Sequence, residues 1–439
     1  LPVLLFPSDQ FATRVPDPVL QQLEDPTSLD VSVNDAFRPV SRFFDRINRP
    51  EQLIPSLLNA MRVLTDPAET GAVTIAMPQD VQAEVFDWPV EFFRKRVWHV
   101  RRPVPEPAAL ERAVALIKAA KRPLIIAGGG TIYAGASEEL RALATATGIP
   151  VGDTQAGKGA INFDHPSAVG GVGSTGCDSG NHIADKADLI IGVGTRYSDF
   201  TTASKTQFKN PDVKFVNINV TPFDAAKESA EMVVADAREA LAALKEALAD
   251  YHVEAAYSEE ITAEKEAWLK ATERCYHLDH GPLPAQTEVF GALNELMGEE
   301  DVVINAAGSM PGDLQALWQA RSPLQYHVEY AFSCMGYEVP AAMGVKLARP
   351  EAEVVSIVGD GTYQMLPMEL ATVVQENIKV IYVLLQNYGF CSIGALSESR
   401  GSQRFGTKYR RRGEGSHLAD EQVIDGVDIA ANARSWGLD

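Results

Sequence analysis

The sequence predicts an α/β protein with three domains, each built on a parallel sheet, of which the first and the last are incomplete. The 439 residues exceed the length of one ordinary domain. Short apolar runs alternate with helical patterns, which is typical of parallel strands covered by helices. Proline-rich and charged stretches separate three such blocks. The chain opens without Met, in a strand-like run, and stops after a helical pattern. We therefore expect a fragment truncated at both ends.

The first block, residues 1–85, is expected to be the C-terminal part of a domain. Its apolar run 1–6 predicts a strand, 50–64 has a helical pattern, and 72–77 predicts a closing strand before a proline. Residues 86–107 hold four prolines and few periodic apolar positions, which predicts a linker.

The second block, residues 108–250, is predicted to be a complete domain. Its expected elements are helix 108–120, strand 123–127, helix 137–147, strand 187–192 and strand 213–219. The charged, alanine-rich run 237–271 is expected to be helical throughout, and residues 251–282 are expected to form a helical linker.

The third block, residues 283–439, repeats the alternation and is expected to be a domain that lacks its C-terminal part. The predicted elements are helix 286–297, strand 302–305, helix 335–348, strand 353–358, helix 367–375 and strand 380–385.

Composition excludes several classes of function. The net charge of −20 argues against a nucleic-acid partner, because such partners are bound by clustered Lys and Arg. No apolar run approaches the roughly 20 residues that span a bilayer, so no membrane partner is expected. The four cysteines form no CxxC pair and are too sparse for a disulfide scaffold, which favours the cytoplasm.

Two glycine-rich runs could approach a nucleotide. Residues 171–176 spell GxGxxG, but the dinucleotide fingerprint needs a strand directly before it, and His165-Pro166-Ser167 stands there instead. We interpret this run as a glycine-rich loop at a sheet edge. Gly128-Gly129-Gly130 follows a predicted strand and is interpreted as a turn at the end of the sheet.

The strongest motif lies in the third block. Gly359-Asp360-Gly361 follows an apolar strand, a helix returns the chain to strand 380–385, and Asn387 comes directly after that strand. The crossover makes the two strands parallel, so their carboxyl ends bring Asp360 and Asn387 to one edge of the sheet.

Carboxylate, amide and carbonyl oxygens are the ligands that Mg²⁺ prefers, and three of them leave positions open for phosphate oxygens. The glycines beside Asp360 allow close backbone approach, and the next helix begins with free N–H groups for a diphosphate. Gly-Asp-Gly alone is also a common turn. The combination is much more specific, because every element stands in its required context.

The whole arrangement resembles the Mg²⁺–diphosphate signature of the thiamine-diphosphate enzymes, whose pyrimidine-binding, central and diphosphate-binding domains follow in this order. The resemblance implies thiamine diphosphate and Mg²⁺ as cofactors and a homodimer or homotetramer. The implied metal ligands are Asp360, Asn387 and Gly389. The implied cofactor contacts are Gly308, Ser309, Met310, Met335, Gly359, Gly361, Thr362, Asn387, Gly389, Phe390 and Cys391.

Met335 would be the apolar residue that holds the cofactor in a bent shape, although a methionine is more often a gap-filler of the core. The glutamate that activates the cofactor in this family is expected upstream of Leu1. Residues 400–415 form a basic segment that departs from the family pattern, so contacts beyond Gly389 are less specific.

Three stretches, 11–22, 194–206 and 307–330, resemble a branch of the family that hydrolyses a polyhydroxylated cyclic 1,2-diketone in myo-inositol breakdown. That substrate class needs several hydrogen-bonding groups. The stretches contain Arg14, Arg196, Ser198, Lys205, Ser309, His327 and Glu329. His327 and Glu329 are candidate substrate contacts, against the alternative that His327 is a packed core residue. Two alternatives stay open, namely an acetolactate synthase or other 2-oxoacid lyase, and a non-catalytic cofactor-binding homologue.

Overall fold

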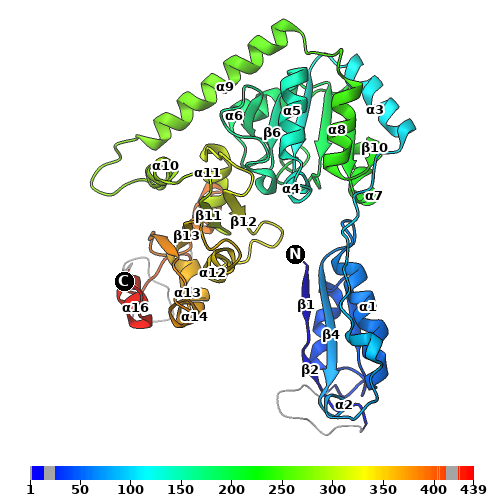
Figure 1. The fold of residues 1–439 in the computed structure, drawn as a ribbon. Coiled ribbons are helices and arrows are strands. Elements are labelled where there is room, and N and C mark those ends of the chain that lie inside the picture. Colours follow the sequence, from blue (N-terminus) through cyan, green and yellow to red (C-terminus); the bar gives the residue numbers. More distant parts are fainter. Residues whose placement is uncertain (1, 14–24, 403, 405, 412–423, 425) are drawn as a thin grey trace. The chain divides into compact units, whose positions relative to one another are not determined.

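The computed structural model describes residues 2–13, 25–402, 404, 406–411, 424 and 426–439. The predicted α/β class is confirmed, because the described residues contain three sheets in which all paired strands run parallel (Figure 1). The chain divides into two compact units, Leu1–Pro103 and Val104–Asp439. The central and last sheets share the second unit, and the finer limits of the three predicted domains stay predictions.

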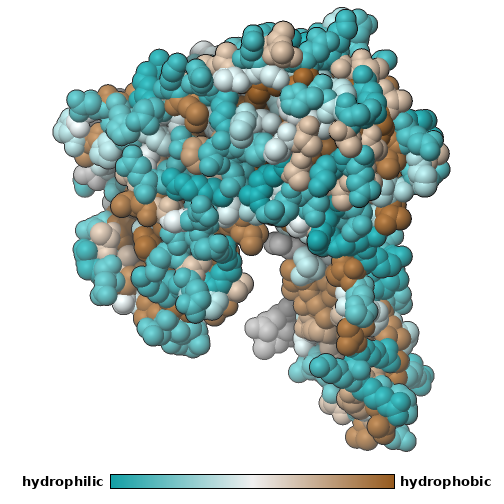
Figure 2. All heavy atoms as spheres, turned by 45° about the horizontal axis from the view of Figure 1, so that its top comes forward, coloured by the Kyte–Doolittle hydropathy of each residue, from teal (hydrophilic) through white to brown (hydrophobic). Residues whose placement is uncertain are grey.

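In the first unit, β4 pairs with β1, β2 and β3. Its elements are β1 (Val3–Leu5), β2 (Ser8–Asp9), η1 (Val33–Val40), β3 (Phe43–Arg46), η2 (Pro50–Gln52), α1 (Leu53–Leu64), β4 (Ala72–Pro78), α2 (Gln79–Gln82) and η3 (Val90–Phe93). Large hydrophobic side chains remain exposed here, among them Val3, Leu5 and Phe6, and Figure 2 shows hydrophobic atoms on this surface.

The central sheet has six strands in the order β10-β9-β8-β5-β6-β7. Leu124, Ile125 and Ile126 of β5 are fully buried, as expected for a parallel strand covered on both faces. The elements are α3 (Pro107–Ala119), β5 (Pro123–Ala127), α4 (Gly129–Tyr133), α5 (Ser137–Thr147), β6 (Val151–Asp153), η4 (Gln155–Gly157), β7 (Ala168–Gly171), α6 (Asp178–Lys186), β8 (Leu189–Val193), β9 (Lys214–Asn219), α7 (Pro222–Ala225), η5 (Lys227–Ser229), β10 (Glu231–Val234) and α8 (Ala237–Ala247).

The last sheet has four strands in the order β12-β11-β13-β14. The predicted parallel pairing of the two motif strands is confirmed, because Gly359 of β13 lies opposite Leu385 of β14. The elements are α9 (Ala255–Tyr276), α10 (Gln286–Leu296), β11 (Val302–Asn305), α11 (Met310–Leu317), β12 (Tyr326–Val328), α12 (Glu338–Ala348), β13 (Val354–Gly359), α13 (Asp360–Met365), α14 (Glu369–Gln375), β14 (Ile381–Leu385), α15 (Cys391–Ser399) and α16 (Ile429–Trp436).

Two helix predictions are wrong. The run 237–271 is not one helix, because α8 ends at Ala247 and α9 begins at Ala255. Val253 in the break is buried, and its N–H donates to Thr147 at 2.9 Å. The helix expected from Met335 begins only at Glu338, because Gly336 has a φ of +91° that no helix accommodates.

The statement that no strand precedes the GxGxxG run is also wrong. β7 comes directly before it at the edge of the central sheet, and was missed because it has only four residues. The glycines serve packing: a Cβ at Gly173 would lie 2.1 Å from the Phe200 carbonyl oxygen, and one at Gly176 would lie 2.4 Å from that of Gly171. The interpretation as a loop at a sheet edge agrees with this geometry.

Buried polar contacts join the central sheet to α11 of the last sheet. Lys158 Nζ donates to the Gln315 carbonyl at 2.8 Å, and Gln155 Nε2 donates to the Pro311 carbonyl at 2.7 Å. Thr175, within the GxGxxG run, donates to Gln315 Oε1 at 2.5 Å. These contacts orient α11 and therefore the segment before it, residues 306–309.

Candidate active site

Asp360 lies at the carboxyl edge of the last sheet, in the first turn of α13, and is 1% exposed. Its Oδ1 accepts the Gly361 N–H at 3.0 Å, and its Oδ2 accepts those of Tyr388 at 2.8 Å and Gly389 at 3.2 Å. The carboxylate therefore ties the loop after β13 to the loop after β14.

Asn387 completes a cluster of oxygens beside Asp360. One of its two side-chain amide atoms lies 2.9 Å from the Gly389 carbonyl oxygen and 3.2 Å from Asp360 Oδ1. If that atom is nitrogen, it donates to both oxygens. If it is oxygen, it stands beside two other oxygens, and these are the donor types that suit Mg²⁺. The predicted ligands are thus neighbours in the structure.

The described residues contain no group of three or more His, Cys, Asp or Glu side chains placed to hold a metal ion. The Asp360 cluster differs in kind, because it combines one carboxylate with an amide and a carbonyl.

The basic segment predicted as unusual packs against this cluster. Phe390 N–H donates to the Thr407 carbonyl at 2.7 Å, and Gly389 forms an antiparallel bridge with Lys408. The Tyr409 hydroxyl accepts Gln364 Nε2 at 2.8 Å, and burial together with the Asp360 charge raises the pKa of Tyr409 to about 12. A neutral phenol thus stands beside the buried carboxylate.

Several predicted cofactor contacts surround the cluster. Gly359 and Gly361 flank Asp360, and Thr362 is buried in the same turn. The Phe390 ring stands 2.8 Å from where a Cβ would lie on Gly361. Cys391 Sγ donates to the Asn387 carbonyl at 3.1 Å, and burial raises the pKa of this thiol.

The segment after β11 forms a second part of the same edge. Met310 is buried, and its methyl group lies 3.7 Å from the Cβ position of Gly359. Gly308 has a φ of +90° with open space around its Cβ position, and Ser309 donates to Gln286 Oε1 at 3.3 Å. Met335 is half-buried.

His327 and Glu329 lie at the end of β12. His327 Nε2 contacts the Tyr337 hydroxyl at 2.8 Å, and burial lowers the pKa of this imidazole, which favours its neutral form. Glu329 accepts the N–H groups of Phe332 at 3.1 Å and Cys334 at 2.6 Å. Glu329 thus holds the loop before Met335, whereas the His327–Tyr337 pair can relay a proton.

The stretches 194–206 and 307–330 meet in the second unit. Ser198 Oγ lies 3.2 Å from the Tyr330 hydroxyl, and Phe200 packs edge-on against the same ring. Tyr197 has a φ of 48°, a strained conformation that accumulates at functional sites.

The remaining polar candidates are not brought together with these. Lys205 pairs with Glu228, and Arg196 is exposed. Arg14 lies outside the described residues.

Sequence reasoning missed Glu338, in the first turn of α12. Glu338 is completely buried, and this burial raises the pKa of its carboxyl to about 7. The N–H groups of Glu338 itself, Ala307 and Gly336 act in the opposite direction and lower that pKa. No sequence signal marks this burial, because a glutamate in the first turn of a helix is ordinarily an exposed, dipole-favoured residue.

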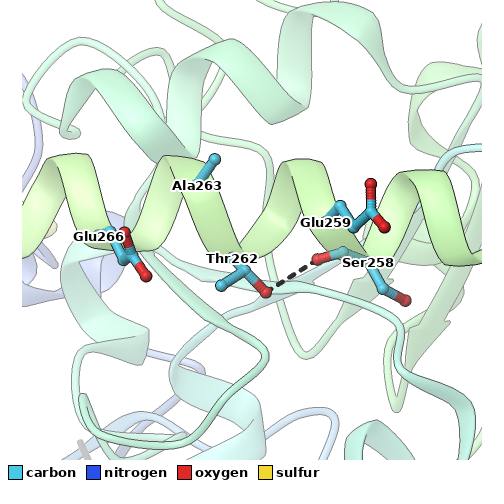
Figure 3. Close-up of a pocket in the computed structure, with 5 residues that line it drawn as sticks. All are labelled: Ser258, Glu259, Thr262, Ala263 and Glu266. Carbon is cyan, nitrogen blue, oxygen red and sulfur yellow. Dashed lines mark hydrogen bonds between the residues drawn. The ribbon is translucent and has the colours of Figure 1, made fainter.

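One depression on the surface lies away from this edge. Its lining residues are all on α9 and are spaced along one side of that helix: Ser258, Glu259, Thr262, Ala263 and Glu266 (Figure 3). Thr262 Oγ1 donates back to the Ser258 carbonyl at 2.9 Å, a bond internal to the helix. Nothing here converges on a ligand.

The fold is α/β, and the edge cluster brings a carboxylate, an amide and a backbone carbonyl together at the carboxyl edge of a parallel sheet. Residues 110–244 match the thiamine pyrophosphate enzyme central domain, and residues 306–439 match the C-terminal thiamine pyrophosphate binding domain. The chain belongs to the thiamine pyrophosphate enzyme family.

Relatives within the family narrow the class. The chain is 48% identical to a 3D-(3,5/4)-trihydroxycyclohexane-1,2-dione hydrolase of Bacillus cereus (strain AH820), over all of this chain and 72% of the relative. It is 47% identical to the protein of the same name from Bacillus anthracis (strain A0248), with the same coverage.

Within the described residues no helix is both long and apolar enough to cross a bilayer.

Proposed function

We propose that the protein hydrolyses a C–C bond of 3D-(3,5/4)-trihydroxycyclohexane-1,2-dione, yielding 5-deoxyglucuronate in myo-inositol catabolism, with thiamine diphosphate and Mg²⁺ as cofactors. The observation that carries this proposal is the identity of 48% to a hydrolase of that name along the whole chain. The meeting of Ser198 with Tyr330 supports it, because the two stretches that resemble this branch contribute hydroxyls to one place.

In the proposed cofactor site, Asp360, the Asn387 amide oxygen and the Gly389 carbonyl would hold Mg²⁺ for the diphosphate. Three backbone N–H groups fix the orientation of the Asp360 carboxylate. Gly359 and Gly361 let the backbone approach phosphate oxygens. Met310 and Met335 would form apolar walls for the rings.

Cleavage of a 1,2-diketone needs a group that accepts the electron pair of the broken bond, and the bound thiazolium supplies that electron sink. The net reaction breaks the bond between the two carbonyl carbons. Water gives its hydroxyl to one carbon, which becomes a carboxylic acid, and a proton goes to the other, which becomes an aldehyde, so the ring opens to a single product that carries both groups. The neutral His327 can accept a proton at a ring nitrogen and pass one through Tyr337. Ser198 and Tyr330 would bind ring hydroxyls.

The test is to give the full-length protein trihydroxycyclohexane-1,2-dione and pyruvate in separate reactions and to follow products by mass spectrometry. We expect 5-deoxyglucuronate from the dione. Acetolactate as the dominant product would favour the 2-oxoacid lyase. Neither product, with thiamine diphosphate still bound, would favour the non-catalytic homologue.

We further propose a homodimer or homotetramer. The exposed hydrophobic side chains of the first unit support association. Sedimentation of the active full-length protein as a monomer at micromolar concentration would contradict this. The four cysteines are all free, which supports a cytoplasmic location.

A further inference from the structure

Glu338 stands out as a buried acid that the proposed mechanism does not use. Its side chain is 0% exposed, and its Oε1 has no hydrogen-bond partner. An unsatisfied buried polar atom is destabilising, and more so if it is charged. Native structures contain few such atoms. Two other carboxyls, those of Asp153 and Glu139, also have an oxygen without a partner, but Lys158 and Arg238 stand beside them.

The carboxyl links two segments that the family resemblance assigns to the cofactor. Oε2 accepts the Gly336 N–H at 3.1 Å, directly after Met335. The Ala307 N–H also faces the carboxyl, directly before Gly308. The backbone carbonyl of Glu338 in turn accepts Ser356 Oγ of β13 at 3.1 Å, so the residue is held from three sides.

Open space lies beside the segments that Glu338 links. Gly308 has open space around its Cβ position. In the turn before Gly336, Cys334 is exposed and Met335 is half-buried. Oε1 itself is enclosed, so a donor group of the cofactor would reach it only through a shift of the turn around Met335.

We propose that Glu338 is a positioning residue of the cofactor site, which holds the Met335 turn against residues 307–309 and offers Oε1 to a hydrogen-bond donor of bound thiamine diphosphate. This inference rests on the proposed cofactor site and deepens it. Glu329 is the charged side chain that acts on the Glu338 carboxyl, and His327 and Tyr337 are the nearby titratable groups on β12 and at the start of α12.

The geometry separates this role from simple packing. Glutamine has the same shape, but once its oxygen accepts the Gly336 N–H, its nitrogen points where Oε1 now lies and repels a donor. Removal of a hydrogen bond to a charged group weakens binding by about tenfold or more. The loss must grow with pH as the wild-type carboxyl ionises, whereas a packing defect would be insensitive to pH.

The experiment is calorimetric titration of the full-length protein with thiamine diphosphate in saturating Mg²⁺, at pH 6 and pH 8. Variants are Glu338→Gln and the control Glu369→Gln, another first-turn glutamate of the last sheet's helices. The ratio of the variant Kd to the wild-type Kd cancels titration of the ligand itself. We expect this ratio to rise for Glu338→Gln from pH 6 to pH 8, to about ten or more, and to stay near one for Glu369→Gln.

A ratio for Glu338→Gln that is equal at both pH values would overturn the inference. If that variant does not fold, Glu338→Asp keeps the charge but shortens the reach, and it must bind more weakly than wild type at pH 8. An Asp360→Ala variant distinguishes failure of the proposed cofactor site from failure of the proposed role of Glu338. If it binds like wild type, the proposed cofactor site is wrong; if it loses binding while the Glu338 variants do not, only the role of Glu338 is wrong.

Discussion

Asp360 and Glu338 are both buried carboxyls beside the last sheet, but their surroundings differ. Both oxygens of Asp360 accept backbone N–H groups, and the loop amide of Asn387 stands next to them. Glu338 has one oxygen without a partner. A buried carboxylate such as Asp360 is tolerated when donors or a cation surround its oxygens. Burial without such partners makes the Glu338 carboxyl hard to ionise.

Replacing Asp360 with Ala should abolish the anchoring charge at the proposed cation site. We expect the affinity for thiamine diphosphate in the presence of Mg²⁺ to fall by about 100-fold, since loss even of residues that support a metal ligand costs 10–100-fold. Calorimetric titration measures the change. Asp212→Ala removes an exposed carboxylate of the same compact unit and should bind like wild type. Equal affinity in the two variants would refute the assignment.

Glu338→Gln should make the cofactor-free protein more stable at alkaline pH. The pKa of Glu338 is raised from 4.5 to about 7 in the folded protein, so the unfolded state ionises first as pH rises. Stability from the protonated group is present below pH 4.5 and is lost through about pH 7. Glutamine does not titrate, so the variant does not lose this stability. Its free energy of unfolding relative to that of wild type should therefore rise by about 2 kcal/mol from pH 5 to pH 8.

Urea unfolding of wild type and variant at both pH values measures the difference. Glu351→Gln, an exposed neutralisation in the same unit, is the control. An advantage of Glu338→Gln that does not change with pH would mean that the carboxyl ionises freely in the folded state.

At the scale of elements, the loop after β14 is shaped by a second segment far along the chain. Tyr388 and Gly389 have φ values of 64° and 148°, and residues 389–390 pair with 407–408. The positive φ values turn the N–H groups of both residues toward Asp360. The pairing therefore preorganises the proposed cation site.

Gly389→Ala should break this arrangement. A Cβ would lie 2.2 Å from the Thr407 carbonyl oxygen, and the φ of 148° is strained for alanine, so we expect a loss of about 1–3 kcal/mol in stability. Thiamine diphosphate affinity should fall with it. Gly401→Ala is the matched control, because Gly401 also has a positive φ but open space around its Cβ position. Wild-type affinity in Gly389→Ala would show that the loop pairing does not shape the site.

At the scale of the whole molecule, the second unit joins two sheets through buried polar groups. Lys158 is 2% exposed, stands 3.5 Å from Asp153 and donates to the carbonyl of Gln315 on α11. Burial raises the pKa of Asp153, and the Lys158 charge opposes that shift. Lys158 therefore has two roles: it joins the two sheets, and its charge compensates the buried Asp153 carboxyl.

Lys158→Ala should destabilise the second unit by about 3 kcal/mol, because it leaves Asp153 buried without its cation. Lys186→Ala removes an exposed lysine that pairs with Glu260 and should cost less than about 1 kcal/mol. Denaturant unfolding compares the two. Equal losses would mean that Lys158 is replaceable by solvent.

The sequence alone determined the α/β class, most long helices and strands, and the motif that placed Asp360 beside Asn387. These follow from local periodicity and from the rule that parallel strands end at one edge, so no distant contact is needed. The four-residue strand β7 and the break between α8 and α9 escaped, because a short strand and a loop have no period of their own.

Only the tertiary structure decided which polar side chains meet. Ser198 contacts Tyr330, which is 132 positions away in the sequence. Lys205 pairs with Glu228, and both oxygens of Glu329 accept N–H groups of its own loop. Burial of Glu338 was equally invisible in the sequence, because desolvation depends on every element packed around a group. Local patterns specify backbone paths, whereas exposure and side-chain partners arise only when those paths pack together.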